Sequence, residues 1–223
     1  RPAAVDRTFR IGQLISAALD RGVRTIVVGL GGSATNDGGA GLLAALGVTA
    51  DRPLDGGPAG LDGVTSADLS VARERLRGTE VVIAADVDVT LLGMSGATKT
   101  FGPQKGLTEP EIIRVDGILD QWVVATCGST PAERRPADAK GAGAAGGLGF
   151  ALMLLGGTVV SGIDLVTEAV GLTELAKTHD LVVTGEGTYD FSSRSGKAVY
   201  GVATVAAAAA RPCIVLAGQV SVA

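Results

Sequence analysis

Side chains that could bind phosphate or a metal ion follow short apolar segments at two places in the chain. The first set comes after Leu30 and consists of Ser33, Thr35, Asn36 and Asp37. The second set comes after Thr184 and consists of Glu186, Asp190, Ser192, Ser193, Arg194 and Lys197. Hydroxyls and cations bind phosphate oxygens, and carboxylates hold Mg²⁺ or accept a proton. Because the carboxyl ends of parallel strands lie at one edge of a sheet, we expect both sets to converge there.

The segment at residues 29–41 is rich in glycine and reads Gly-Leu-Gly-Gly-Ser-Ala-Thr-Asn-Asp-Gly-Gly-Ala-Gly. Glycine tolerates dihedral angles that other residues avoid, so successive backbone N–H groups can turn toward one anion and a ligand can approach closely. The segment therefore predicts a phosphate cradle. Its candidate binding residues are Gly31, Gly32, Ser33, Thr35, Asn36, Asp37, Gly38 and Gly39.

Two other interpretations of this segment stay open. Residues 29–34 match the dinucleotide fingerprint in the form that ends with Ala, and Asp51 lies near the distance expected of a ribose-binding residue. That match predicts an oxidoreductase with a nicotinamide cofactor. The fingerprint should open a helix at once, however, whereas polar turn residues and further glycines precede Leu42. The second alternative is a glycine-rich turn that serves only close helix packing.

Lys197 lies after a strand and loop, near the expected start of a helix, which is a position suited to phosphate. The segment before it is not a Walker A loop, because Phe191 stands where that loop needs Gly and Ala198 replaces the required hydroxyl. Lys105 lies in the sequence Phe-Gly-Pro-Gln-Lys-Gly, whose turn residues fix its direction. For Lys105 and Lys197, as for Glu186 and Asp190, the alternative is a solvated surface side chain.

Helical and strand-like segments alternate along the chain, and the expected strands are short runs of Val, Ile and Leu that are apolar on both faces. This pattern is typical of an α/β fold with a mostly parallel sheet covered by helices. We expect strands at residues 25–30, 81–85, 181–184 and 213–217, and helices at residues 11–20, 42–46, 108–127 and 197–210. Residues 134–143 are expected to form a surface linker, and residues 185–196 a loop.

Four residues have structural rather than catalytic interpretations. Thr108 and Glu111 match a capping box at the start of the third helix. Trp122 falls in the apolar pattern of that helix and is expected in the core. His179 precedes a strand and is expected to cap the end of a helix rather than to catalyse a reaction.

The composition excludes several classes of protein. The chain has 223 residues, of which 46% are hydrophobic, and this apolar content is enough for a folded core. The net charge is −4, and the charged residues form no long run of one sign. Neither nucleic acid nor an anionic membrane surface is therefore an expected partner. Two distant cysteines, Cys127 and Cys213, and a single histidine cannot assemble a disulfide framework or a zinc site.

The expected location is the cytoplasm, and the expected partners are small molecules. No apolar signal segment opens the chain. The uncharged stretch at residues 141–163 contains eight glycines, so we expect it to be buried in a soluble protein rather than to span a membrane. A homo-oligomer is compatible with the sequence.

Four motifs, in this order, resemble those of the bacterial glycerate kinase family. They are residues 31–41, residues 101–106, residues 141–149, and residues 184–187 followed by Asp190 and the pair Gly196 and Lys197. The resemblance covers residues 12–219. It implies ATP-dependent phosphorylation of D-glycerate by a two-lobed α/β enzyme in which one lobe is flavodoxin-like.

The resemblance leads to a set of hypotheses about roles. The backbone of residues 31–41 cradles the phosphates of ATP, with hydroxyl donors from Ser33 and Thr35, and Lys105 or Lys197 neutralises the transferred group. Asp190 accepts the proton of the glycerate hydroxyl, Glu186 holds Mg²⁺, and Arg194 clamps the glycerate carboxylate. Asp37 could exchange roles with either acid. The expected product is 2-phosphoglycerate, with 3-phosphoglycerate as the alternative.

The chain departs from the family pattern in two ways. Val89 and Thr90 replace the usual Asn-Pro, and residues 9–12 replace the usual Tyr-Gly-Thr-Gly. Family members also extend beyond both ends of this chain, so residues 1–223 are expected to be an incomplete glycerate-kinase-like region whose lobe boundary the sequence does not assign. A nucleotide-binding fragment without turnover is therefore a further alternative.

Overall fold

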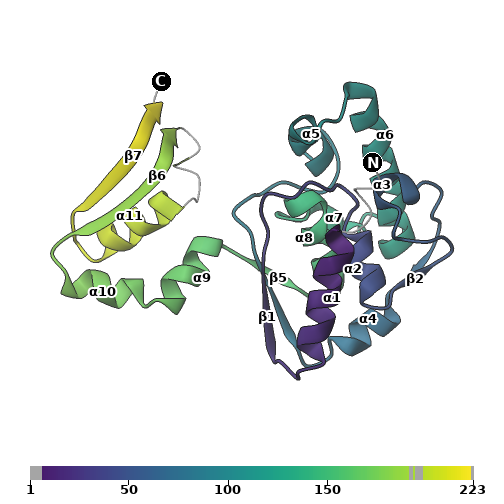
Figure 1. Cartoon of the computed structure of the whole chain (residues 1–223), viewed down its shortest axis with the longest axis horizontal. Helices are drawn as coiled ribbons and strands as arrows, with labels where there is room; N and C mark the ends of the chain where they lie inside the picture. The colour runs from purple at the N-terminus through teal and green to yellow at the C-terminus, as the bar shows by residue number, and fades with distance from the viewer. Residues whose placement is uncertain (1–6, 191–192, 194–197, 222–223) are drawn as a thin grey trace. The chain divides into compact units, whose positions relative to one another are not determined.

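The computed structural model describes residues 7–190, 193 and 198–221, and it has the expected α/β fold. The chain divides into two compact units, Arg1–Val159 and Val160–Ala223, each with its own parallel strands and helices (Figure 1).

The first unit is built on a small sheet with the strand order β1-β4-β5. Strands β1 (Thr25–Gly29) and β4 (Glu80–Ala84) pair in parallel, with Val27 opposite Val82, and β5 is Thr158–Val160. Helix α1 (Arg7–Leu19) packs against α2 (Ala40–Ala45), which follows β1 after the glycine-rich loop. The strands predicted at residues 25–30 and 81–85 are confirmed, whereas α1 begins four residues before the predicted start.

Helix α6 (Glu109–Cys127) places the only tryptophan in the core. The capping box is confirmed, because the Glu111 carboxylate accepts hydrogen bonds from the Thr108 N–H at 2.7 Å and from its hydroxyl at 2.6 Å. The helix ends at Gly128, whose φ of 109° is accessible mainly to glycine. Trp122 is fully buried and packs with α8 (Leu148–Leu154) in one apolar cluster, as predicted.

Shorter elements complete the first unit: β2 (Thr49–Ala50), α3 (Gly57–Gly60), β3 (Ala67–Asp68), α4 (Ser70–Arg75), α5 (Ala97–Phe101), η1 (Pro103–Lys105), α7 (Arg135–Asp138) and η2 (Ala144–Gly146). The prediction of a surface linker at residues 134–143 is wrong in part. This segment contains α7, and Ala137 and Ala142 are fully buried because they fit against the core. Among the described helices, none has the length and apolar character that crossing a membrane requires.

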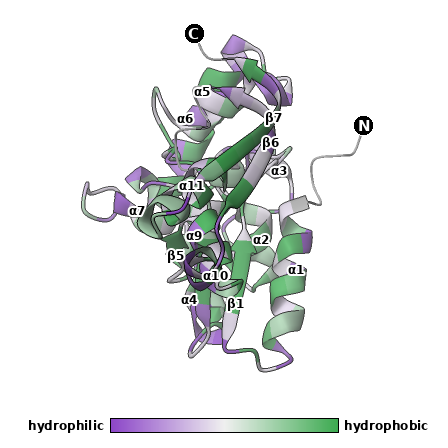
Figure 2. Ribbon diagram, turned by 90° about the vertical axis from the view of Figure 1, so that its left-hand side faces the viewer, coloured by the Kyte–Doolittle hydropathy of each residue, from purple (hydrophilic) through white to green (hydrophobic). Residues whose placement is uncertain are grey.

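The second unit contains helices α9 (Gly162–Ala169), α10 (Leu172–Thr178) and α11 (Ala198–Ala208) and a parallel pair of strands, β6 (Val182–Asp190) and β7 (Cys213–Ser221). Helix α11 packs against both strands. The opposite face of the pair is apolar and exposed, with Val183 opposite Ile214 and Leu216 63% exposed (Figure 2). His179 caps α10 as predicted, since its Nδ1 lies 2.8 Å from the carbonyl oxygen of Leu175.

The prediction that residues 185–196 form a loop is wrong for residues 185–190. Strand β6 continues through its two glycines to Asp190, because β7 supplies a partner along the whole length, from Val182 opposite Cys213 to Asp190 opposite Ser221. Glu186 and Asp190 therefore lie on a strand. Glycine weakens a strand through its entropy and its lack of a side chain to pack, and the pairing with β7 overrides that preference here.

Two helical glycines allow a matched test of how tightly α8 packs in the core of the first unit. A Cβ on Gly149 of α8 would lie 2.0 Å from the carbonyl oxygen of Gly141, whereas a Cβ on the exposed Gly117 of α6 would meet no atom within 4 Å. We expect Gly149→Ala to lower the free energy of unfolding by about 2 kcal/mol or more, because the core cannot accommodate the methyl group. We expect Gly117→Ala to raise it by about 0.5–1 kcal/mol through helix propensity. Urea unfolding measures the free energy of unfolding of both variants. Equal changes in the two variants would contradict the close packing of Gly149 against Gly141.

Candidate functional site

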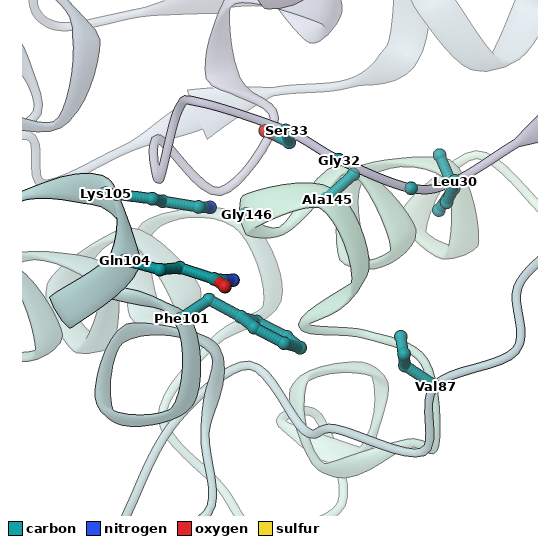
Figure 3. Close-up of a pocket in the computed structure, with 10 residues that line it drawn as sticks. Leu30, Gly32, Ser33, Val87, Phe101, Gln104, Lys105, Ala145 and Gly146 are labelled. Atoms are coloured by element: carbon teal, nitrogen blue, oxygen red, sulfur yellow. The ribbon is translucent and has the colours of Figure 1, made fainter. Parts of the chain in front are cut away.

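A pocket in the first unit is lined by residues from four separate parts of the chain (Figure 3). The glycine-rich loop contributes residues 30–33, the α5–η1 segment contributes Phe101, Gln104 and Lys105, and the η2 turn contributes Ala145 and Gly146, with Val87 at the side. The cavity itself is small, about 120 Å³, and it opens to solvent. The side chains of Gln104 and Lys105 extend into it from one wall.

The same loop residues border a second cavity. Residues 30–33 and Ala145 line both cavities, and the second is closed by residues of α1, β1 and α8, among them Thr8, Ile11 and Leu148. Gly31 and Gly32 are exposed and Ser33 is half-buried, and Gly32 has a φ of 54°. This part of the loop therefore presents its backbone to ligand-sized space, as a phosphate cradle requires.

The following part of the loop is buried, and its polar groups are bound within the protein. Asp37 is only 4% exposed, and its Oδ2 accepts a hydrogen bond from the Thr8 hydroxyl at 2.5 Å. The backbone N–H groups of Gly39 and Gly41 also donate to this carboxylate, at 3.1 and 3.4 Å. The Gly38 N–H donates to the carbonyl oxygen of Gly146 at 3.0 Å. The backbone N–H groups of Gly38 and Gly39 are thus engaged by the protein itself.

The remaining predicted loop residues, Thr35 and Asn36, are also buried. Thr35 is held by Ser33, whose Oγ lies 3.2 Å from both the N–H and the hydroxyl of Thr35. Asn36 donates from its Nδ2 to the hydroxyl of Thr98 in α5 at 2.7 Å, and its Oδ1 is buried without a hydrogen-bond partner. The loop is consequently fixed from Ser33 onward.

Lys105 connects the opposite wall of the pocket to the loop. Its ammonium group donates to the carbonyl oxygen of Thr35 at 2.6 Å. Burial lowers the pKa of Lys105 below its ordinary value, and the negative charge of Asp37 opposes that shift. A partly desolvated ammonium group beside exposed glycine backbone is suited to bind an anionic oxygen.

Asp37 supplies the compensating charge behind this wall. Burial raises the pKa of Asp37 above the ordinary aspartate range, while the hydrogen bonds from Thr8, Gly39 and Gly41 counteract the rise. Asp37 lines neither cavity around the loop. Its position favours an anchoring role over proton transfer to a ligand.

The η2 turn packs against the loop more closely than any side chain would permit. A Cβ on Gly146 would lie 1.9 Å from the carbonyl oxygen of Thr35, and a Cβ on Gly147 would lie 2.5 Å from the Cα of Gly38. Ala145, which lines both cavities, adopts a left-handed conformation with φ 51° and ψ 39°. The sequence assigned no individual role to Ala145, Gly146, Phe101 or Gln104, although the motifs at residues 101–106 and 141–149 contain them.

The other predicted site residues belong to the second unit. Glu186 lies within β6, half-buried, with its Oε1 buried and without a hydrogen-bond partner. Asp190 is the last residue of β6, and its N–H donates to the Ser193 hydroxyl at 3.0 Å. Arg194 and Lys197 lie outside the described residues.

The geometry does not support the dinucleotide interpretation of residues 29–34. Helix α2 begins only at Ala40, so no helix N-terminus stands directly after the first glycines to receive a pyrophosphate. Asp51 uses its carboxylate locally, accepting from the N–H of Thr65 at 3.1 Å and from its hydroxyl at 2.7 Å. The Asp51 carboxylate is therefore engaged by the segment that precedes β3.

Comparison with known proteins points to one family. The sequence profile of the Glycerate kinase family matches residues 1–223. A glycerate kinase of Bacillus subtilis (strain 168) is 42% identical over 99% of this chain and 59% of its own length. A glycerate 2-kinase of Escherichia coli (strain K12) is 40% identical over 94% of this chain and 56% of its own length.

The same similarity appears in three dimensions. A crystal structure described as a glycerate kinase 2 from Salmonella typhimurium LT2 superposes with a TM-score of 0.79 at 37% identity, covering 100% of this chain and 63% of the other. The chain thus spans somewhat more than half the length of the relatives that it matches.

The bond between Thr8 and Asp37 gives a pH-dependent prediction. Thr8→Val removes a donor that lowers the pKa of Asp37, so the pKa of Asp37 rises further in the variant. The two proteins should then differ most in stability where Asp37 is ionised in both, and least where it is protonated in both. We expect a loss of about 1–3 kcal/mol at about pH 8 and a smaller loss at about pH 4. Urea unfolding at both pH values measures this.

Thr8→Ser is the matched control, because it retains the hydroxyl and should show little pH dependence in its effect. A loss in Thr8→Val that is the same at both pH values would contradict an ionised Asp37 as the acceptor of this bond.

Proposed function

The chain belongs to the glycerate kinase family, and on that premise we propose that it transfers the γ-phosphoryl group of ATP to a hydroxyl group of D-glycerate. One observation of the structure carries this proposal most directly. The exposed glycines at residues 31 and 32, the Ser33 hydroxyl and the partly desolvated Lys105 line one pocket. Such a combination of backbone donors, a hydroxyl and a cation suits phosphate.

Phosphoryl transfer depends mainly on positioning and on neutralising the negative charge of the transferred group. In the proposed complex, the backbone of Gly31 and Gly32 and the hydroxyl of Ser33 contact phosphate oxygens. Lys105 exchanges the carbonyl oxygen of Thr35 for a phosphate oxygen, which strengthens its hydrogen bond because the acceptor is then charged.

We assign the buried part of the loop a supporting role. The carboxylate of Asp37 already accepts from Thr8, Gly39 and Gly41, so it fixes the loop and balances the charge of Lys105. Three acids were considered from the sequence as the proton acceptor or the Mg²⁺ ligand. With Asp37 in a supporting role, Asp190 and Glu186 remain for these two roles. Gly38 and Gly39 then act by allowing close packing rather than by contacting ATP.

Glu186 suits Mg²⁺, because its buried Oε1 lacks a partner and carboxylate oxygen is a preferred ligand of that ion. Mg²⁺ usually keeps several waters and one or two carboxylates, so a single acid is compatible with its chemistry, and when bound it would reduce the charge of the ATP phosphates. Asp190 is proposed to accept the proton of the attacking hydroxyl. The roles proposed for Lys197 and Arg194, in neutralising phosphate and in clamping the glycerate carboxylate, rest on the sequence alone.

We propose 2-phosphoglycerate as the product, following the name of the Escherichia coli relative. We also propose that the protein works in the cytoplasm and that its partners are these small molecules, ATP and D-glycerate. The alternative product is 3-phosphoglycerate, since a small shift of the bound acid exchanges the two hydroxyl groups.

The test is to incubate the purified protein with MgATP and D-glycerate and to measure ADP. ADP formation that requires glycerate supports the kinase, and phosphorus NMR of the product then distinguishes the 2- from the 3-phosphate. ATP binding without turnover would replace the proposal by a nucleotide-binding fragment. Binding of NADH without binding of ATP would overturn both.

Substitution of Lys105 tests the pocket directly. We expect Lys105→Met to weaken MgATP binding by about 10- to 100-fold, because a charged hydrogen bond to phosphate is lost while the aliphatic stem is kept. Lys140→Met is the control, since Lys140 is exposed and pairs with the exposed Asp88. The affinity of this variant for MgATP should stay within about twofold of that of the wild type. Titration calorimetry measures both. Equal affinities of the two variants would remove Lys105 from the site.

Substitution of Asp190 tests the proposed base. Asp190→Asn keeps the shape of the side chain and removes its basicity, so turnover should fall by about 10²- to 10⁴-fold while ATP affinity changes little. Asp180→Asn, at an exposed position of the same unit, should leave turnover unchanged. Steady-state rates and ATP binding are measured for both variants. Turnover of Asp190→Asn within about threefold of the wild type would exclude Asp190 as the base.

A further inference from the structure

Two hydrogen bonds join the walls of the candidate pocket in the first unit. One runs from the ammonium group of Lys105 to the carbonyl oxygen of Thr35, at 2.6 Å. The other runs from the side-chain amide of Asn36 to the hydroxyl of Thr98, at 2.7 Å. Thr98 is fully buried and lines neither cavity beside the loop, so it would not touch a ligand.

Thr98 is held firmly in its own segment. It lies in α5, where its carbonyl oxygen accepts from the Gly102 N–H at 2.9 Å, and a Cβ on Gly102 would lie 2.3 Å from the same oxygen. Phe101 follows three residues later and therefore lies on the same side of this short helix. Helix α5 thus presents one residue to Asn36 and another to the pocket.

Asn36 depends on this bond for its position. It stands between Thr35, whose carbonyl oxygen binds Lys105, and the anchored Asp37. Among the described residues, Thr98 is the hydrogen-bond partner found for the Asn36 side chain, because its Oδ1 has none. Loss of the Thr98 hydroxyl would leave a buried amide with no partner, and the loop would have to move to solvate it.

We propose that Thr98 is a positioning residue of the pocket, which sets, through Asn36, the separation between the glycine-rich loop and the wall that carries Lys105. The proposal rests on the function given above only for the identity of the ligand. The spacing of the glycine-rich loop and the wall that carries Lys105 governs how many of their binding groups can contact one anion at the same time.

The simpler alternative is a bond that contributes stability and nothing else. The positioning role and the purely stabilising role predict different results when Asn36 and Thr98 are both replaced by apolar residues. Replacing both members of a buried pair by groups of similar shape can restore stability, because no polar group is left without a partner. It does not restore the directional hydrogen bond that would set the spacing.

The experiment compares Thr98→Val, Thr98→Ser and the double variant Asn36→Leu/Thr98→Val. Three quantities are measured for each: the thermal unfolding midpoint, the affinity for MgATP by calorimetry, and the pKa of Lys105 by carbon NMR of labelled lysine, with Lys105→Met identifying the signal. Thr98→Ser should match the wild type within about twofold in affinity, since it keeps the hydroxyl.

For Thr98→Val we expect affinity for MgATP to fall by about tenfold and the pKa of Lys105 to rise toward the ordinary lysine value as water reaches the ammonium group. The double variant should regain thermal stability but keep the weakened affinity and the altered pKa. If Thr98→Val does not fold, the double variant carries the test.

Two results would overturn the proposal. One is a Thr98→Val protein with wild-type affinity and an unchanged Lys105 pKa. The other is a double variant in which affinity and pKa recover together with stability. If the wild-type protein fails to bind MgATP, the proposed function fails, whereas the Lys105 pKa still decides the role of Thr98.

Discussion

Folding removes the carboxylate of Asp37 from water and surrounds it with donors, and the candidate pocket depends on this burial. The Thr8 hydroxyl reaches it from α1, and the N–H groups of Gly39 and Gly41 reach it from the start of α2. A buried carboxylate without such partners would be very unfavourable, so the three donors and the acid hold one another in place. The loop that leads into α2 is thereby fixed at its far end, and Lys105 gains a nearby negative charge.

Close backbone packing completes the same arrangement. Gly146 and Gly147 lie so near Thr35 and Gly38 that a methyl group at either position would collide with the main chain. The Gly38 N–H meets the Gly146 carbonyl oxygen, and the indole N–H of Trp122 donates to the Gly38 carbonyl oxygen at 3.3 Å. The glycines thus serve two purposes: some expose backbone to the pocket, and others let backbone segments touch.

This division of the loop has a chemical consequence. An anion site works best when its donors are preorganised, because little reorganisation is then needed on binding. Here the exposed residues, Gly31 and Gly32, come immediately before a segment that is fully satisfied within the protein. Thr98 and Lys105 attach the opposite wall to that fixed segment, so the pocket is bounded by two elements that cannot easily separate.

The sequence by itself determined the α/β class, the strands β1 and β4, the capping box of α6, the burial of Trp122 and the cap formed by His179, because these depend on local pattern and on neighbouring residues. It also predicted the glycine-rich loop and Lys105 as candidate phosphate-binding groups, and in the structure both line one pocket.

Only the tertiary structure decided which loop residues line that pocket and which are buried. Thr8 and Asp37 are 29 residues apart, and Asn36 and Thr98 are 62 apart. The extension of β6 to Asp190 likewise depended on its pairing with β7. A hydrogen bond or a buried surface between distant residues exists only once the fold has brought them together, and spacing along the chain carries no record of it.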